Sequence, residues 1–237
     1  SGDGYRISNP LLMNTIKNVG SSNIEWSGAG GANVAISKLD RIGSVEFDGE
    51  DNEIRDFGLS DLNGTGAKTI LLWFFAGSDV SSLQGLFGLG NNGSPGRSVN
   101  ALFRSDRFDV RFRGTYNMTY EPSFIFDDWN HVSISWDDNS NMNQTIVTIN
   151  GSVETPVSTR SVNIDIADSD LRLGRSFDAN NFGNIIISDF RLYTRKLDLE
   201  EIEDIYNHKN ITPGLVGHWP LDDGPGATTV RDLSGNN

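Results

Sequence analysis

The sequence has no cysteine, which removes several ways of stabilising or using a protein. Disulfides and thiolate zinc sites are excluded, and so is a thiol nucleophile. No apolar run approaches the length of a membrane span, and the first residues, Ser-Gly-Asp-Gly, lack signal-peptide character. We therefore expect a soluble chain without membrane insertion, and a fragment of a longer protein. The 237 residues show no compositional break, which favours one main domain.

Positive charge is also scarce. The formal net charge is −13, arginine outnumbers lysine, and the acidic residues are scattered along the chain. This composition argues against nucleic acid as a partner. It fits either an ordinary solubilising surface or adaptation to high salt, and a halophilic protein would lose stability when salt is removed. Six Asn-x-Ser/Thr sequons weakly favour a glycosylated surface, at Asn63, Asn92, Asn117, Asn143, Asn150 and Asn210.

Short runs of alternating apolar and polar residues, separated by turn residues such as Asn63-Gly64 and Asn150-Gly151, predict an all-β chain. We expect strands over residues 44–47, 69–75, 85–89, 101–104, 108–113, 130–136, 145–150, 171–174, 185–193 and 215–221. These short strands favour a two-sheet antiparallel jelly-roll sandwich over a propeller, which would need a repeat of about forty residues.

The last part of the chain shows two different periods. Residues 185–193 alternate, with one face of the strand made of Ile186, Ser188, Phe190 and Leu192. After Asp198, which is placed as a helix cap, apolar residues recur at steps of three and four, at Leu199, Ile202, Ile205 and Tyr206. This pattern predicts one short C-terminal helix.

Five short motifs precede that strand and helix in a fixed order. They are Val45-Glu46-Phe47-Asp48-Gly49, Lys68-Thr69-Ile70-Leu71-Leu72-Trp73-Phe74, Trp129-Asn130-His131-Val132-Ser133-Ile134-Ser135-Trp136-Asp137, Thr148-Ile149-Asn150-Gly151 and Leu171-Arg172-Leu173-Gly174. Their order and spacing resemble laminin-G-like domains of the concanavalin A-like lectin/glucanase superfamily. The resemblance covers about residues 45–207 and implies a concanavalin A-like sandwich that serves as a recognition module.

The C-terminus departs from this pattern. Residues 215–236, which begin Leu215-Val216-Gly217-His218-Trp219-Pro220-Leu221, resemble the motif with which such domains usually open. We therefore predict a laminin-G-like domain over residues 1–213. Residues 214–237 either begin a following repeat of a tandem array or supply a permuted strand that closes the same sandwich. The second arrangement is favoured, because an isolated strand would expose apolar side chains and unpaired backbone.

The acidic helix is the main candidate for a catalytic site. Its geometry disfavours a catalytic role. Glucanases of the superfamily carry a pair of carboxylates on a strand, about 5 Å apart. Here the acids lie on the solvent side of the predicted helix, at Glu200, Glu201, Glu203 and Asp204. No nucleophile elbow and no phosphate-binding glycine loop occurs. We therefore expect no enzyme activity.

A structural calcium ion is a further expectation from the resemblance, because related modules often bind one where their first and last strands meet. Calcium takes six to eight oxygen ligands. The aspartates expected there are Asp48, Asp189, Asp222, Asp223 and Asp232. The alternative is that each is an ordinary turn or capping aspartate.

Side chains opposite the core face supply the ligand-binding candidates. With Phe108, Val110 and Phe112 inward, Arg111 and Arg113 point outward, and Tyr116 and Tyr120 follow in a loop. Alternation also turns Leu71, Trp73 and Phe75 to the outer face of the other sheet, where we expect Leu71 and Phe75 to be covered. The binding candidates are Trp73, Arg111, Arg113 and Tyr116.

Together these features favour a non-catalytic recognition or adhesion module of an extracellular, cell-surface or virion-attached protein. Its expected partners are carbohydrate or a glycoprotein on a cell surface or matrix, besides neighbouring domains of the same longer chain. A structural spacer or oligomerisation domain without a soluble ligand is the main alternative. A polysaccharide hydrolase or lyase comes third, because no strand carries the required acids.

Overall fold

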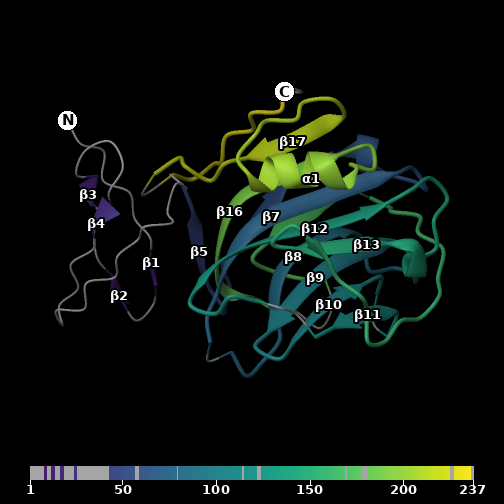
Figure 1. The fold of residues 1–237 in the computed structure, drawn as a ribbon, viewed down its shortest axis with the longest axis horizontal. Helices are drawn as coiled ribbons and strands as arrows, with labels where there is room; N and C mark the ends of the chain where they lie inside the picture. Colours follow the sequence, from purple (N-terminus) through teal and green to yellow (C-terminus); the bar gives the residue numbers. More distant parts are fainter. Residues whose placement is uncertain are drawn as a thin grey trace.

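The computed structural model describes residues 8–9, 12–13, 17–18, 24–25, 43–56, 59–78, 80–113, 115–121, 124–168, 170–177, 181–224 and 227–235. Two antiparallel sheets, one of six strands and one of seven, pack face to face (Figure 1). Within the described part there is one α-helix, and it lies against the outside of the larger sheet. The predicted jelly-roll sandwich with one short helix is confirmed.

The larger sheet has the strand order β14-β13-β12-β7-β16-β17, and β5 also pairs with β16. Its strands are β5 (Val45–Asp48), β7 (Lys68–Ala76), β12 (Asp128–Trp136), β13 (Ile146–Ile149), β14 (Ser152–Val153), β16 (Asn184–Tyr193) and β17 (Leu215–Trp219). The smaller sheet has the order β11-β10-β9-β8-β15-β6. Its strands are β6 (Ile54–Asp56), β8 (Gln84–Gly90), β9 (Ser98–Arg104), β10 (Arg107–Arg111), β11 (Asn117–Tyr120) and β15 (Leu171–Leu173).

The remaining elements are short. The helix α1 spans Leu199–Tyr206, and 3-10 turns span Ser60–Leu62 and Met142–Gln144. Two strand pairs precede the sandwich: β1 (Ser8–Asn9) with β2 (Leu12–Met13), and β3 (Lys17–Asn18) with β4 (Ile24–Glu25). They lie to one side of it in Figure 1.

The core lies between the two sheets, and alternation along the strands fills it. Ile70, Leu72 and Phe74 of β7 point inward, as do Phe108 and Val110 of β10. All five side chains are almost fully removed from water. These inward positions agree with the sequence prediction, and they leave every second residue of each strand on an outer face.

The strand β16 does not alternate as predicted. A register shift between Ser188 and Arg191 marks a β-bulge, and Asp189 has a positive φ of 47° within it. The bulge moves the pattern by one residue, so Ile187 shares the core with Phe190 and Leu192. The prediction that Ile186 lies on the same face is therefore wrong, because a bulge inserts an extra residue that a strict period of two does not allow for.

The hairpin after β10 also differs from the prediction. The strand ends at Arg111, and a tight turn follows in which Arg113 has a φ of 82° and the Tyr116 N–H donates to the Arg113 carbonyl at 3.0 Å. Tyr120, expected in a loop, lies in β11 and is fully buried. The four residues of β11 are too short a run to stand out by period alone.

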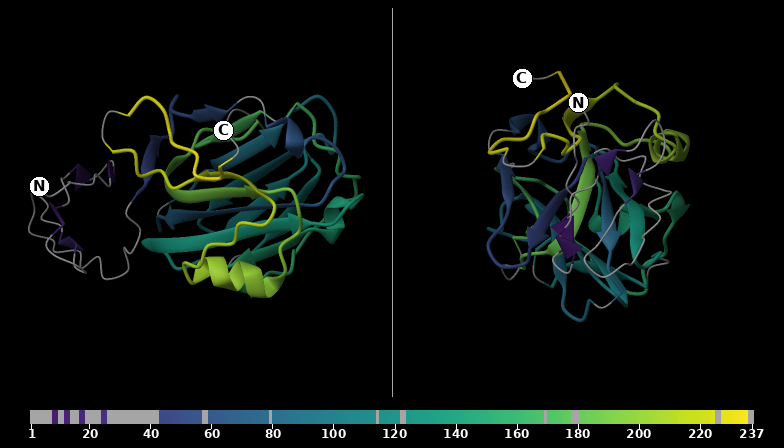
Figure 2. Two further views of the ribbon diagram at one scale, coloured as in Figure 1. Left: turned by 90° about the horizontal axis from the view of Figure 1, so that it is seen from above. Right: turned by 90° about the vertical axis from the view of Figure 1, so that its left-hand side faces the viewer.

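The segment after Pro213 forms β17 and joins the same sandwich. It pairs antiparallel with the second half of β16, while β5 pairs with the first half. Trp219 and Leu221 reach the core between the sheets. The returning chain covers the edge of β17, since the Leu233 N–H donates to the His218 carbonyl at 2.8 Å (Figure 2, yellow). The strand thus occupies an edge of this sheet, whereas the domain boundary at residue 213 stays a prediction.

The helix α1 begins with the predicted cap. The Glu201 N–H donates to Asp198 at 2.8 Å, and the Glu201 side chain accepts from the Asp198 N–H in return. Ile202 and Ile205 pack on Leu71, so the outward apolar face of β7 is covered here. Leu199 is 52% exposed and takes no part in this contact.

Candidate binding face

The outer face of the six-stranded sheet is mostly polar, in contrast with its inner face. Because Phe108 and Val110 fill the core, Asp109 and Arg111 of β10 point outward. The same alternation turns Arg172 outward between the buried Leu171 and Leu173. Strands from both halves of the sheet therefore bring arginines to one surface.

One row of cross-strand partners crosses this face at right angles to the strands. From β6 to β11 it consists of Arg55, Arg172, Gly88, Asn100, Arg111 and Asn117, which we call the polar row. Neighbouring strands lie about 4.8 Å apart, so Arg172 and Arg111, three strand spacings from each other, are separated by roughly 14 Å along the sheet.

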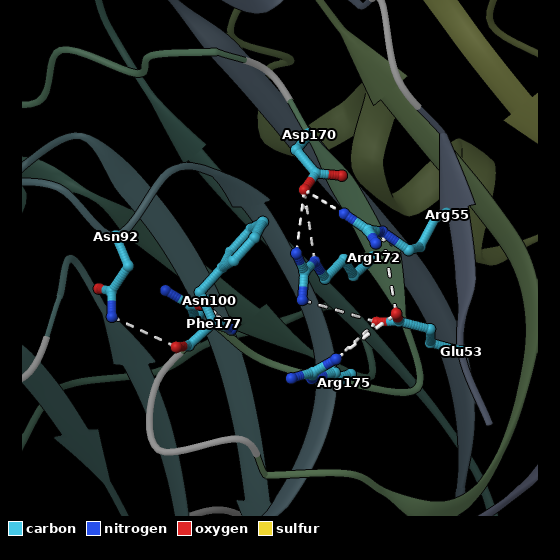
Figure 3. A network of polar contacts seen from close by, with 8 residues as sticks. All are labelled: Glu53, Arg55, Asn92, Asn100, Asp170, Arg172, Arg175 and Phe177. Atoms are coloured by element: carbon cyan, nitrogen blue, oxygen red, sulfur yellow. Dashed lines mark hydrogen bonds and ion pairs between the residues drawn. The ribbon is translucent and has the colours of Figure 1, made fainter. Parts of the chain in front are cut away.

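The centre of the polar row has no side chain of its own and is filled by Phe177. A Cβ on Gly88 would lie 2.7 Å from Phe177 Cδ2 and 2.9 Å from Asn100 Oδ1, so a larger residue would displace the ring. The Phe177 N–H donates to Asn100 Oδ1 at 2.7 Å, and Asn92 donates to the Phe177 carbonyl at 3.3 Å (Figure 3). The guanidinium of Arg172 lies 4.5 Å from the ring centroid. Phe177 is thus half-buried and fixed at the middle of the row.

Two carboxylates hold the arginines on one side of Phe177. Arg55 and Arg172 are direct cross-strand neighbours, an arrangement that would repel if it stood alone. Asp170 Oδ2 accepts from Arg55 at 3.0 Å and from Arg172 at 3.2 Å. Glu53 lies 3.8 Å from each of these guanidiniums and 3.4 Å from that of Arg175 (Figure 3). The acids therefore offset the repulsion and orient three arginines.

A second arginine group lies on the other side of Phe177, on β10. Asp109 is fully buried, and its Oδ2 accepts from Arg111 at 2.6 Å and from Arg107 at 2.8 Å. Thr119 donates to the other carboxylate oxygen at 2.9 Å. The side chains of Arg111 and Arg107 remain 14% and 31% exposed. This group is rigid at its base and reachable from solvent.

The two groups gather arginines on a strongly acidic protein. Among the described residues they join five guanidinium groups to three carboxylates. The whole chain has a formal net charge of −13. The outer face of the smaller sheet is therefore a place where arginines are concentrated.

Trp73, a predicted ligand contact, lies on the other sheet and under the end of α1. Its ring stacks on Tyr206 with centroids 5.3 Å apart and lies 5.0 Å from the ring of His131. His208 stacks at 6.2 Å, and 8% of Trp73 is exposed. These contacts use the ring to hold the helix against the sheet, and a ligand-binding role for it stays a prediction.

The other three candidates separate in a similar way. Arg111 lies in the polar row, whereas Arg113 belongs to the turn after β10. Tyr116 packs against the core. The structure therefore places Trp73 on the other sheet, Tyr116 against the core and Arg113 in the turn that follows the strand of Arg111.

Asp189, the first of the predicted calcium ligands, is bound by two basic side chains. Arg191 donates to it at 2.8 and 3.0 Å, and His218 Nε2 lies 2.9 Å from its Oδ1. Burial alone would raise the pKa of Asp189, but the hydrogen bond from His218 and the charge of Arg191 outweigh this and hold the pKa well below its usual range. The triad joins β16 to β17.

The other four predicted ligands are also used by the protein itself. Asp48 accepts the Glu50 N–H at 2.9 Å, and this bond lowers the pKa of Asp48. Asp222 pairs with Arg231 at 2.9 Å, and Asp223 accepts the backbone N–H of the same arginine at 3.2 Å. Asp232 accepts from the His218 and Ser234 N–H groups, each at 2.8 Å. Among the described residues no three His, Asp or Glu gather as a metal site, so calcium stays a prediction that these contacts do not support.

Two acidic side chains of α1, Glu201 and Asp204, contact basic residues and serve the fold. Glu201 binds Arg195 through two bonds of 2.7 Å, which lowers the pKa of the carboxyl. Asp204 pairs with Lys209 at 2.6 Å. They lie on the helix outside the larger sheet, away from the polar row.

The sequence predicts an outward Arg111 but not the rest of the row. Three residues were too few to mark β6, so Arg55 had no assigned face. Arg172 could have been found, since it alternates with two leucines in a predicted strand. The glycines of β8 were the signal for Phe177, because a glycine inside a strand often marks the close approach of another segment.

The comparisons with known proteins concern the fold. Residues 48–203 match the family model described as the concanavalin A-like lectin/glucanases superfamily. No curated protein matches the chain. Among the described residues no helix is long and apolar enough to cross a membrane, α1 having eight residues.

Several solved structures share the architecture at low identity. A native heptameric SAP-like pentraxin from Limulus polyphemus matches with a TM-score of 0.50 and 14% identity, over 72% of this chain and 84% of the pentraxin. The botulinum neurotoxin serotype D ligand-binding domain, in complex with N-acetylneuraminic acid, matches with 0.54 and 13%, over 79% and 51%. A mutant NanB sialidase from Streptococcus pneumoniae matches with 0.52 and 18%, over 68% and 27%. The chain thus spans about half of the toxin domain and about a quarter of the sialidase.

Proposed function

Because this chain belongs to the laminin-G-like part of the concanavalin A-like lectin/glucanases superfamily, we propose that it is a non-catalytic carbohydrate-recognition module that binds through the polar row. The observation that carries the proposal is Phe177, fixed on Gly88 between two arginine groups. An extracellular location, on a cell surface or attached to a virion, belongs to the same proposal.

The chemistry of the row suits a sugar. A pyranose ring presents apolar C–H faces that pack on an aromatic ring, and its hydroxyls accept hydrogen bonds from guanidinium groups. Asn100 is fully buried and Asp109 is fully buried beneath Arg107 and Arg111, so the supporting layer is already ordered. A preorganised surface loses little conformational entropy on binding, which favours affinity on a shallow face.

The proposal excludes catalysis because of how the carboxylates on this face are used. Glycoside hydrolysis needs one carboxyl group to protonate the leaving oxygen and a second to act on the sugar. The carboxylates of this face, Glu53, Asp109 and Asp170, are each engaged by two or three arginines. We therefore propose that these carboxylates hold the arginines in place and do not act on a glycosidic bond.

A glycan array followed by titration calorimetry on the hits tests the proposal. We expect Phe177→Ala to weaken binding at least tenfold while the melting temperature changes little, because the ring lies outside the core. Phe126→Ala is the matched control, since this aromatic residue is 40% exposed in another loop. It should leave affinity unchanged.

Three results would contradict the proposal. Equal losses in Phe177→Ala and Phe126→Ala would mean that the polar row is not the binding surface. Silence across all glycans, together with a defined oligomer, would favour a spacer. Release of reducing sugar from neutral or acidic polysaccharides would favour an enzyme.

A further inference from the structure

We infer that Asn92 is a modification site, at which spontaneous deamidation releases the backbone of Phe177 and weakens the proposed binding face. The reaction at Asn92 does not depend on the proposed function. Its effect on ligand binding rests on that function and adds a way in which binding is lost with time.

Two asparagine side chains clamp the backbone of Phe177. Asn100, which is fully buried, accepts the Phe177 N–H at 2.7 Å. Asn92, which is exposed in the loop after β8, donates from Nδ2 to the Phe177 carbonyl at 3.3 Å (Figure 3). One half of the clamp is therefore shielded, and the other half is open to water.

The residue after Asn92 makes this exposed half chemically labile. Gly93 has no side chain, so its backbone nitrogen can approach the amide of Asn92 with little steric hindrance. The nitrogen attacks Cγ of Asn92 and forms a cyclic imide, and the side-chain nitrogen leaves as ammonia with the proton of the Gly93 N–H. Water then opens the imide at one of its two carbonyls, which gives aspartate or isoaspartate. The reaction needs no reagent other than water.

Two other Asn-Gly pairs occur in the chain, and the fold restrains both. The Gly64 N–H donates to the Ile166 carbonyl at 2.7 Å, so the attacking nitrogen after Asn63 is tied in a backbone bridge. The side chain of Asn150 accepts the His131 N–H and donates to Asn130 Oδ1, each at 2.9 Å. The amide must break both bonds before it can react.

The restraint at Gly93 is of another kind. Its N–H donates to a side-chain oxygen, Asn91 Oδ1, at 2.9 Å, and residues 92–94 are all exposed. The amide of Asn92 is held by the single long bond to Phe177. Asn92 should therefore react before the other two asparagines.

Deamidation removes a donor from the clamp. A carboxylate accepts hydrogen bonds but cannot donate one, so the Phe177 carbonyl loses its bond from residue 92. Isoaspartate also lengthens the main chain by one carbon, which shifts the side chain. The bond from the Phe177 N–H to Asn100 remains, so we expect the ring to lose its fixed position while the fold persists.

Peptide mapping by mass spectrometry measures the reaction. The full chain is produced in a host without N-glycosylation, so that the sequon at Asn92 carries no glycan, and is kept in mildly alkaline buffer without ligand. We expect Asn92 to deamidate at least tenfold faster than Asn63 and Asn150 in the folded chain. In concentrated urea the three should react at similar rates, because the restraints of the fold are gone. Gly93→Ala should slow the reaction at Asn92 in both states.

Variants test the effect on binding, with the glycans found on the array as ligands. Asn92→Asp should weaken binding several-fold, which is less than the loss in Phe177→Ala, because the ring is still present. Asn143→Asp is the matched control, since this asparagine is exposed in the 3-10 turn at residues 142–144. It introduces the same charge and should leave affinity unchanged. Melting curves confirm that each variant is folded.

The outcomes separate this inference from the proposed function. Equal rates at the three asparagines in the folded chain, or a stable Asn92, would overturn the modification site and leave carbohydrate recognition intact. Full affinity in Asn92→Asp, with binding still lost in Phe177→Ala, would overturn the effect on the clamp. Rapid deamidation at Asn92 in a chain that binds no glycan would support the modification site and overturn the proposed function.

Discussion

The ion triad that joins β17 to β16 offers a sharp test of how the sandwich is closed. Asp189→Asn removes the negative charge but keeps the size of the side chain and its oxygen. Asparagine also tolerates the positive φ that the bulge imposes, so backbone strain is not added. The variant therefore tests the negative charge of Asp189, which both Arg191 and His218 contact.

The size of the effect follows from burial. Arg191 keeps 8% of its side chain exposed, His218 12% and Asp189 18%. Removing one partner of a buried ion pair costs about 3–5 kcal/mol, since the other charge stays buried without compensation. The asparagine oxygen still accepts a hydrogen bond, so we expect the lower end, about 3 kcal/mol. For a chain of this size that lowers the melting temperature by roughly 6–12 °C.

The ion triad also makes the stability of the fold depend on pH. The pKa of Asp189 in the folded state is held below its ordinary value of 3.8, because the bond from His218 and the charge of Arg191 outweigh the effect of burial. A lowered carboxyl pKa stabilises the fold above the unfolded-state value, and that contribution is lost as the pH falls below about 4. The difference between wild type and Asp189→Asn should therefore be full at pH 7 and shrink in strong acid.

Thermal unfolding at pH 7 and at a series of lower values measures both effects. The control is Asp137→Asn, which breaks an ion pair with Lys196 at 2.7 Å whose carboxylate is 68% exposed. It should change stability by about 0–1 kcal/mol. Equal losses in the two variants, or a difference that persists unchanged in strong acid, would refute the role of the triad.

Further predictions concern the helix, the closing strand, the ion and the salt. Asp198→Ala removes the helix cap and should cost about 1 kcal/mol by urea unfolding; no loss would mean that packing alone holds α1. Deletion of residues 214–237 removes Trp219 and Leu221 from the core and should lower the melting temperature by roughly 10 °C or more. If calcium is bound, chelation lowers the melting temperature and Asp189→Asn abolishes that shift. If the acidic surface reflects adaptation to high salt, stability falls when molar KCl is removed, and an unchanged melting temperature would contradict this.

The sequence predicts the sandwich well because the apolar residues of its strands and helix recur at regular intervals. Alternation places Ile70, Leu72 and Phe74 in the core, and the step of three along α1 places Ile202 and Ile205 against the sheet. The prediction fails where one residue breaks the period. The bulge at Asp189 is such a place, and no residue type in the strand announces it.

The candidate site was predicted only in part, because it depends on which strands lie side by side and on the register in which they pair. Arg55, Arg172 and Arg111 lie in one row through four strand pairings, of which β6 with β15 and β15 with β8 join strands that are distant in the chain. A single sequence shows that a residue points outward, but not which strand lies beside it. Phe177 enters the row from a loop, so period carries no information about it.

The position of α1 explains why the polar row is on the smaller sheet. The helix covers the outer face of the larger sheet, where it packs Ile202 and Ile205 on Leu71 and stacks Tyr206 on Trp73. That face is apolar because it is a second, smaller core. No helix among the described residues covers the outer face of the six-stranded sheet, so its outward positions can carry charge. The short helix covers one sheet, and the outer face of the other sheet is left for the recognition that we propose.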